Sequence, residues 1–105
     1  LPHHPDAVFT TSDMMALGAL RAIREIGLRI PDEIALVGFD DMPFAANTTP
    51  PLTTIRQPVA RTGAIAAETL IDLVAHPQQP PRRILLPTEL VIRQSCGALA
   101  SPSAD

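Results

Sequence analysis

Polar side chains follow apolar segments of the sequence at the points where those segments end. Ser12 and Asp13 come after a first short apolar run, and Asp40 and Asp41 come after a second. Gln57 follows a third β-prone stretch. If the first two runs are neighbouring parallel strands, their carboxyl ends lie on one edge of a sheet. Hydroxyl, carboxylate and amide groups together suit a polyhydroxyl ligand, so the sequence predicts a ligand site at this edge.

Each of these side chains also has a structural interpretation. Ser12 and Asp13 both stand where a helix N-cap is expected, and for Asp13 capping is the favoured interpretation. Asp41 can initiate the following turn through its side chain. Asp40 directly follows an apolar strand, where an unpaired charge is costly, so we interpret it as a ligand-binding residue rather than a member of an ion pair. Gln57 suits a pocket and the surface equally well.

A strand–helix–strand unit would bring the two polar ends together. Residues 7–10 (AVFT) predict a strand, and residues 34–39 (IALVGF) predict a strand buried on both faces of a parallel sheet. Between them we expect a helix from Asp13 or Met14 to about Ile26, closed by Gly27 in the left-handed conformation. Its predicted core stripe has the spacing of one helical face and comprises Ala16, Ala19, Leu20, Ile23 and Ile26.

The second half of the chain predicts further elements of both kinds. Residues 42–51 form a loop rich in Pro, Asn and Thr, and residues 52–55 are β-prone. A second helix is expected from Val59 to Ala75, followed by a stiff proline-rich linker over residues 77–81. Residues 84–86 and 89–92 predict two more strands, and residues 97–105 predict a disordered tail. The fold class is therefore α/β.

Composition excludes several classes of function. The chain has 105 residues, of which 46% are apolar, enough for one small domain with a core. The net charge is −3 and the eight basic residues are scattered arginines, so this chain lacks the basic stripe that nucleic acid requires. No apolar run approaches the roughly 18–20 residues of a membrane helix. The single Cys96 cannot form an internal disulfide, which fits a reducing cytosol.

Motifs for catalysis, metals and cofactors are missing from the sequence. The histidines lack the spacing of metal ligands, and Cys96 has no evident His partner for thiol catalysis. The pair Asp40 and Asp41 would suit magnesium in a phospho-accepting receiver or a hydrolase. A receiver also needs a Lys on a later strand, and the chain has none. We therefore predict a binding protein without metal or cofactor, and not an enzyme.

Four segments in order resemble the LacI/GalR family of bacterial repressors, and more loosely the periplasmic sugar-binding proteins of the same fold. Together they cover nearly the whole chain up to Cys96. The segments are SDMMALGA at 12–19, IPDEIALVGFDD at 30–41, PLTTIRQP at 51–58 and LPTELVIR at 86–93. The resemblance implies a parallel-sheet βαβ fragment of a periplasmic-binding-protein-like (type I) fold.

The resemblance also implies roles for the polar residues. Asp40 is similar to the carboxylate that grips ligand hydroxyls in these regulators and sugar-binding proteins. Ser12 occupies a position where an Asn often contacts the ligand, so its shorter hydroxyl would reach the ligand through water. Gln57 matches a position that lines the cleft near the crossover between subdomains. The implied ligand is a small-molecule effector, a sugar or related polyol.

A partner surface is expected on the first helix. Met14 and Leu17 fall on the side of the helix opposite the core stripe. Apolar side chains on a polar face can mark an interface with a partner, but single exposed apolar residues are common, so this pattern favours an interface only slightly. The resemblance implies the same surface, because Leu17, Leu20 and the loop around Asn47 are similar to the family's dimer-forming region. Leu20 also belongs to the predicted core stripe.

Family members are considerably longer and cross between two subdomains around a cleft. The resemblance therefore divides the chain into a C-terminal subdomain portion (1–58), a crossover helix and strand of the N-terminal subdomain (59–87), a return strand (88–96) and the tail. The helix at 59–75 would then lack its natural sheet. The expected function is ligand-responsive transcription regulation in the cytoplasm by a homodimer, with DNA bound through a headpiece that this chain does not contain. The alternative is a transport-type sugar-binding protein.

Overall fold

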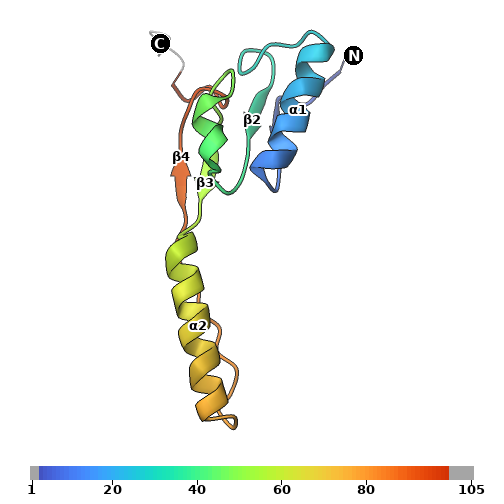
Figure 1. Cartoon of the computed structure of the whole chain (residues 1–105). Helices are drawn as coiled ribbons and strands as arrows, with labels where there is room; N and C mark the ends of the chain where they lie inside the picture. The colour runs from blue at the N-terminus through green and yellow to red at the C-terminus, as the bar shows by residue number, and fades with distance from the viewer. Residues whose placement is uncertain (1–2, 100–105) are drawn as a thin grey trace. The chain divides into compact units, whose positions relative to one another are not determined.

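The computed structural model describes residues 3–99, which form two compact units. Of the described residues, unit 1 comprises 3–56 and 89–99, and unit 2 comprises Gln57–Thr88 (Figure 1). In chain order the elements are β1 (Ala7–Phe9), α1 (Asp13–Glu25), β2 (Ala35–Val37), the 3₁₀ helix η1 (Pro43–Asn47), β3 (Thr54–Arg56), α2 (Val59–Ala75) and β4 (Glu89–Val91).

Two short strand pairs organise unit 1. Strands β1 and β2 are parallel, with Phe9 opposite Val37 at the end of the pair. Strands β3 and β4 are antiparallel, with Arg56 opposite Glu89. Parallel bridges, one of them between Val37 and Thr53, connect the end of β2 to the β3 region. The parallel pair joined through a helix confirms the α/β fold class.

Helix α1 begins and ends close to the predicted positions. Gly27 has a φ of 85°, which confirms its predicted left-handed conformation after the helix. Ile23 is buried as the core stripe requires, but Ile26 is 58% exposed. The prediction for Ile26 was wrong because the helix ends at Glu25, so the side chain lies beyond the last turn that faces the core.

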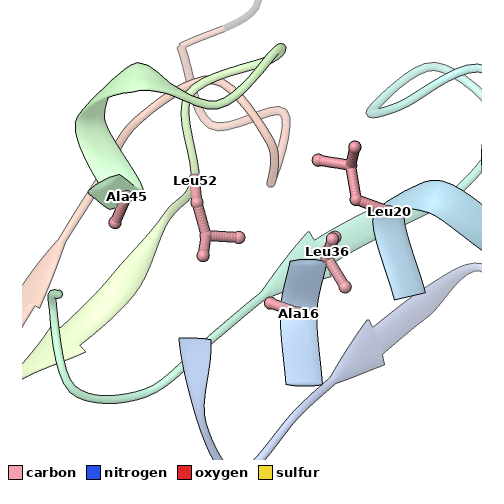
Figure 2. Close-up of a cluster of buried hydrophobic side chains, with 5 residues drawn as sticks. All are labelled: Ala16, Leu20, Leu36, Ala45 and Leu52. Carbon is pink, nitrogen blue, oxygen red and sulfur yellow. The ribbon is translucent and has the colours of Figure 1, made fainter. Parts of the chain in front are cut away.

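The core of unit 1 lies between α1 and the region of η1 and β3. Figure 2 shows Leu36 of β2 beside Ala16 and Leu20 of α1, with the side chain of Leu52 pointing toward them. Leu36 is fully buried, as is Ala45 of η1. Burying a Leu side chain stabilises a fold by about 1.5–3 kcal/mol, so this cluster is the main apolar contribution to unit 1.

Strand β2 and the following loop differ from their predictions. The strand covers Ala35–Val37 rather than residues 34–39, and its two end residues are half-buried rather than buried on both faces. The face that carries Leu36 is covered by α1 and η1, whereas the other face is only partly covered in unit 1. Helix η1 was not predicted, because a single 3₁₀ turn that starts at Pro43 carries no repeating apolar pattern.

Unit 2 is built on α2, which has the predicted bounds, Val59–Ala75. Each residue of α2 is at least partly exposed, and Ile71 and Val74 are 69% and 75% exposed. The chain then returns along the helix (Figure 1), where Arg82 forms an ion pair with Asp72. Residues 84–86 are not a strand, and Leu85 is 83% exposed. That prediction was wrong because unit 2, as described, contains no neighbouring strand to pair with this segment.

Two remaining predictions concern a disordered C-terminal tail and the lack of a membrane-spanning helix. Of the predicted disordered tail at 97–105, residues 100–105 lie outside the described residues. Among the helices of residues 3–99, none is both long and apolar enough to span a bilayer.

Candidate ligand-binding edge of the sheet

The segments that follow β1 and β2 meet at one edge of the sheet. The Thr10 amide donates to the Val37 carbonyl at 2.9 Å, and the Asp13 amide donates to the Phe39 carbonyl at 2.9 Å. These bonds continue the parallel register beyond the strands themselves. The ends of β1 and β2 therefore meet as predicted, with Ser12 in the segment after β1 and Asp40 in the segment after β2.

Ser12 is the N-cap of α1. Its extended backbone (φ −156°, ψ 157°) precedes the first helical residue, and its hydroxyl accepts a hydrogen bond from the Met15 amide at 3.1 Å. The side chain is half-buried. A hydroxyl that accepts a bond still has a proton to donate, so the capping bond is compatible with a ligand contact.

Asp13 is not the cap but a buried anchor, so the favoured interpretation of this residue was wrong. Its side chain is fully buried, and Oδ1 accepts from the Thr54 hydroxyl at 2.6 Å. Oδ2 accepts from the Met42 amide at 2.7 Å. A Cβ on Gly38 would lie 2.3 Å from Asp13 Oδ1, so glycine leaves the space that this carboxylate occupies. Asp13 thus ties the helix start to the loop after β2 and to β3.

Asp40 stands in a backbone conformation that few non-glycine residues adopt. Its φ is 122°, and the next residue, Asp41, has a φ of 54°. The Asp40 amide donates to the Ile55 carbonyl at 2.8 Å, which fixes this residue against β3. Strained conformations of this kind persist where the surroundings enforce them, often at binding sites.

The Asp41 side chain forms ion pairs with two arginines, so its interpretation as a turn initiator was wrong. Oδ2 lies 2.7 Å from Arg56 Nε, and Oδ1 lies 2.8 Å from Arg93 Nη2. Burial by itself raises the pKa of Asp41, but hydrogen bonds from Arg56 and Arg93, together with their positive charges, outweigh it and hold that pKa below 3.8. The carboxylate is therefore ionised at neutral pH.

Sequence reasoning missed two residues that hold this edge and a third that is buried elsewhere in unit 1. The sequence analysis counts Arg56 and Arg93 only among the scattered arginines, whereas Arg56 at the end of β3 and Arg93 after β4 both donate to Asp41. Ser95 is fully buried, where its hydroxyl donates to the Leu36 carbonyl and accepts from the Thr53 amide at 2.8 Å. The signal available was their position: each follows or ends a β-prone segment.

Gln57 is the first residue of unit 2, and its side chain is half-buried. Ser12 and Asp40 belong to unit 1. The assignment of Gln57 to the same pocket stays a prediction.

Comparison with known proteins identifies the family. The family model described as a periplasmic binding protein-like domain matches residues 1–96. The chain belongs to this family. The fold class predicted from the sequence is thereby confirmed, since a periplasmic binding protein-like domain is the type of fold that the four segments implied.

Relatives of this family member are transcription regulators. A probable repressor, ExuR, of Bacillus subtilis is 41% identical over 101 residues, which are 96% of this chain and 30% of the relative. The regulator MalR of Streptomyces coelicolor is 47% identical over 89 residues, or 85% of this chain and 26% of the relative. The ribose operon repressor of Haemophilus influenzae is 42% identical over 95 residues, or 90% and 29%. The chain thus spans about a third or less of these relatives' lengths.

Solved structures of regulators share the fold. The regulator CelR in complex with cellobiose has a TM-score of 0.80 and 41% identity, covering 86% of this chain and 28% of that one. A putative LacI regulator from Bacillus cereus has a TM-score of 0.84 and 30% identity, covering 91% and 34%. These matches confirm the resemblance to LacI-type regulators. The named relatives are repressors and regulators rather than enzymes.

The residues predicted to form a dimer surface differ in exposure. Met14 is 62% exposed and Asn47 is exposed, whereas Leu17 is half-buried. Leu20 is 7% exposed and packs in the core of unit 1, as its place in the core stripe predicted. Its side chain offers little area to a second chain, and the dimer surface as a whole stays a prediction.

Residues 3–99 contain no group of three or more His, Cys, Asp or Glu side chains that would hold a metal ion. Cys96 is half-buried and its sulfur lies 3.9 Å from the Arg93 carbonyl oxygen.

Proposed function

We propose that this chain is the part of a ligand-responsive transcription regulator that carries one wall of the effector pocket. The effector is a sugar or a related polyol, bound without chemical change and without metal or cofactor. Ser12 and Asp40 contact it from unit 1, and Gln57 contributes from the crossover into unit 2. The protein acts in the cytoplasm as a homodimer, and DNA is read by a headpiece outside this chain.

The observation that supports this proposal most directly is the meeting of two strand ends. The Asp13-to-Phe39 backbone bond places Ser12 and Asp40 in neighbouring segments at the carboxyl edge of a parallel sheet. In open α/β sheets ligands bind at this edge. A hydroxyl and a carboxylate can together donate to and accept from a sugar. Two related structures hold ligands of this class: the cellobiose of CelR and the ribose of an Enterococcus faecium LacI regulator.

Regulation requires that ligand binding change the orientation of one part of the protein relative to another. In the complete protein, a ligand that bridges the two subdomains binds one of their relative orientations better than others, and that difference in affinity is the coupling free energy between effector and DNA. The dimer then passes the change to two headpieces. We assign Met14, Leu17 and Asn47 to the dimer surface, with Leu20 supporting it from the core.

The ligand part is tested on the complete gene product that contains this chain. Cellobiose, ribose and sucrose are titrated by calorimetry and by thermal shift, because saturating ligand raises the unfolding temperature of the state that it binds. We expect at least one sugar to bind and Asp40→Asn to weaken it about tenfold or more. Asp32→Asn, an exposed acid, is the matched control. Binding that survives Asp40→Asn unchanged contradicts the assignment, as does a protein that responds to none of these sugars.

The regulatory part is tested by DNA release and by assembly. A mobility shift on the gene's own promoter DNA is expected to change when the binding sugar is added. Leu17→Glu is expected to convert dimers to monomers in sedimentation equilibrium, whereas Arg24→Glu on the same helix leaves the dimer intact. DNA binding that ignores the sugar, or an unchanged dimer in Leu17→Glu, argues against the corresponding part.

A further inference from the structure

The segment that carries Asp40 is held at every residue. The Phe39 carbonyl accepts from the Asp13 amide at 2.9 Å, and the Asp40 amide donates to the Ile55 carbonyl at 2.8 Å. The Asp41 amide donates to the Thr54 hydroxyl at 3.2 Å. These bonds fix three consecutive residues against α1 and β3, which is more restraint than a surface loop normally receives.

Restraint is needed because two consecutive non-glycine residues have positive φ angles. The value at Asp40, 122°, lies outside the main allowed regions, and the value at Asp41, 54°, lies in the range of the small left-handed region that non-glycine residues adopt uncommonly. A chain free to relax would leave this conformation. Something must therefore stabilise it, and hydrogen bonds of the backbone alone would be available in unstrained conformations as well.

An additional restraint acts on the Asp41 side chain. It is 10% exposed and accepts from Arg93 at 2.8 Å and from Arg56 at 2.7 Å. Arg93 is itself 18% exposed, and its Nη1 donates to the Leu52 carbonyl at 2.9 Å, so the guanidinium is fixed independently of Asp41. Arg56 is 50% exposed and also contacts Glu89 at 3.2 Å. Charge-assisted bonds that are shielded from water are the stronger kind.

We propose that Arg93 and Arg56 are positioning residues that act through Asp41: they hold the backbone of Asp40 in the conformation from which its carboxylate binds the effector. Arg93 contributes more, because it is less exposed and is held by a second bond. The inference rests on the proposed ligand role of Asp40. It adds that effector affinity depends on two arginines that the ligand does not need to touch.

The contacts of Asp41 with Arg56 and Arg93, here called the clamp, also lie next to the two strands that connect unit 1 to unit 2. Arg56 is the last residue of unit 1 before the chain enters unit 2, and Glu89 is the first residue after it returns. The two are paired across β3 and β4. Asp41 is thus connected through Arg56 to both crossover strands, and a change in those strands reaches the Asp40 backbone through one side chain.

The first experiment needs no ligand. Hydrogen exchange of the complete gene product is compared for wild type, Arg93→Gln, Asp41→Asn and the control Arg29→Gln, which breaks an exposed pair with Glu33. We expect amides 39–42 to exchange about tenfold faster or more in the first two variants, with α1 unchanged. Asn tolerates positive φ, so a matching result in Asp41→Asn isolates the loss of charge. Unchanged exchange at 39–42, or an increase throughout unit 1, overturns the inference.

The second experiment measures affinity for whichever of cellobiose, ribose and sucrose the wild-type protein binds. Arg93→Gln is expected to weaken binding about tenfold, because only the fraction of molecules in the binding conformation contributes. In the Asp40→Asn background the same substitution should have little further effect. A full additional loss there shows that Arg93 does not act through Asp40. If no sugar binds, the proposed function fails while the exchange experiment still decides whether the clamp holds the backbone.

Discussion

Asp41 Oδ1 and Arg93 Nη2 lie 2.8 Å apart although 52 residues separate them in the sequence. The bond joins the loop after β2 to the segment after β4, and a second arginine joins the same carboxylate to β3. The edge where the ligand is proposed to bind is therefore held together by charge, whereas the core behind it is held by apolar packing. The following predictions separate these two contributions.

Gly38→Ala is expected to destabilise the chain by about 1–3 kcal/mol, because a Cβ there would displace the buried Asp13 carboxylate from its hydrogen bonds. Urea unfolding followed by circular dichroism measures the change. Gly18→Ala is the matched control: no atom lies within 4 Å of its added Cβ. Removing a glycine from the middle of α1 should stabilise by about 0.5–1 kcal/mol. Equal effects at both positions would contradict the prediction.

Asp13→Ala is expected to cost about 3 kcal/mol, since it leaves the Thr54 hydroxyl and the Met42 amide without their charged acceptor. The exposed Asp6→Ala should change the free energy of unfolding by less than about 0.5 kcal/mol. Equilibrium unfolding in urea compares the two. A loss no larger than that of Asp6→Ala would mean that these bonds do not stabilise the fold.

Ser12→Ala is expected to destabilise α1 by about 1 kcal/mol through loss of its cap, whereas Ser12→Asn should retain stability because Asn caps equally well. Thermal unfolding of both variants tests this. Since only the alanine variant loses the cap, any change in sugar affinity common to both reports on ligand contact and not on helix stability.

Acid unfolding should depend on Asp41. The two arginines lower the folded-state pKa of Asp41 below 3.8, so the ion pairs contribute stability above that pH and lose it as the pH falls through the lowered value. Measured between pH 2 and pH 5, the unfolding free energy of Asp41→Asn should therefore fall less steeply on acidification than that of wild type. Parallel curves would show that Asp41 is not the group responsible.

Local pattern was sufficient to predict most elements. Helix α2 begins at Val59 and ends at Ala75 as expected, because its apolar repeat is regular and Pro77 follows. That the segments carrying Ser12 and Asp40 are neighbours followed from one topological rule for parallel strands. The strand prediction for residues 84–86 was wrong because an apolar, β-prone segment becomes a strand only where another strand is present to accept its hydrogen bonds.

The structural roles of Asp13 and Asp41 were not predictable from the sequence. Asp13 follows a cap position and Asp41 follows a strand end, and both are common in exposed turns. Their actual partners, Thr54, Arg56 and Arg93, come from segments brought together only by the fold. Nothing in the local pattern distinguishes a buried carboxylate from an exposed one when its partners lie 41 or 52 residues away.

Arg56 and Glu89 face each other across an antiparallel pair, and every residue of unit 2 lies between them in the chain. Unit 2 is therefore topologically an insertion into a β-hairpin. A two-residue Asn-Gly turn, which suits the twist of such a pair, can replace residues 57–88 and close β3 directly onto β4. The shortened protein would keep the hydrogen bonds of Asp13 and the ion pairs of Asp41. The junction between Arg56 and Glu89 is also a site where a different sensor domain could be inserted.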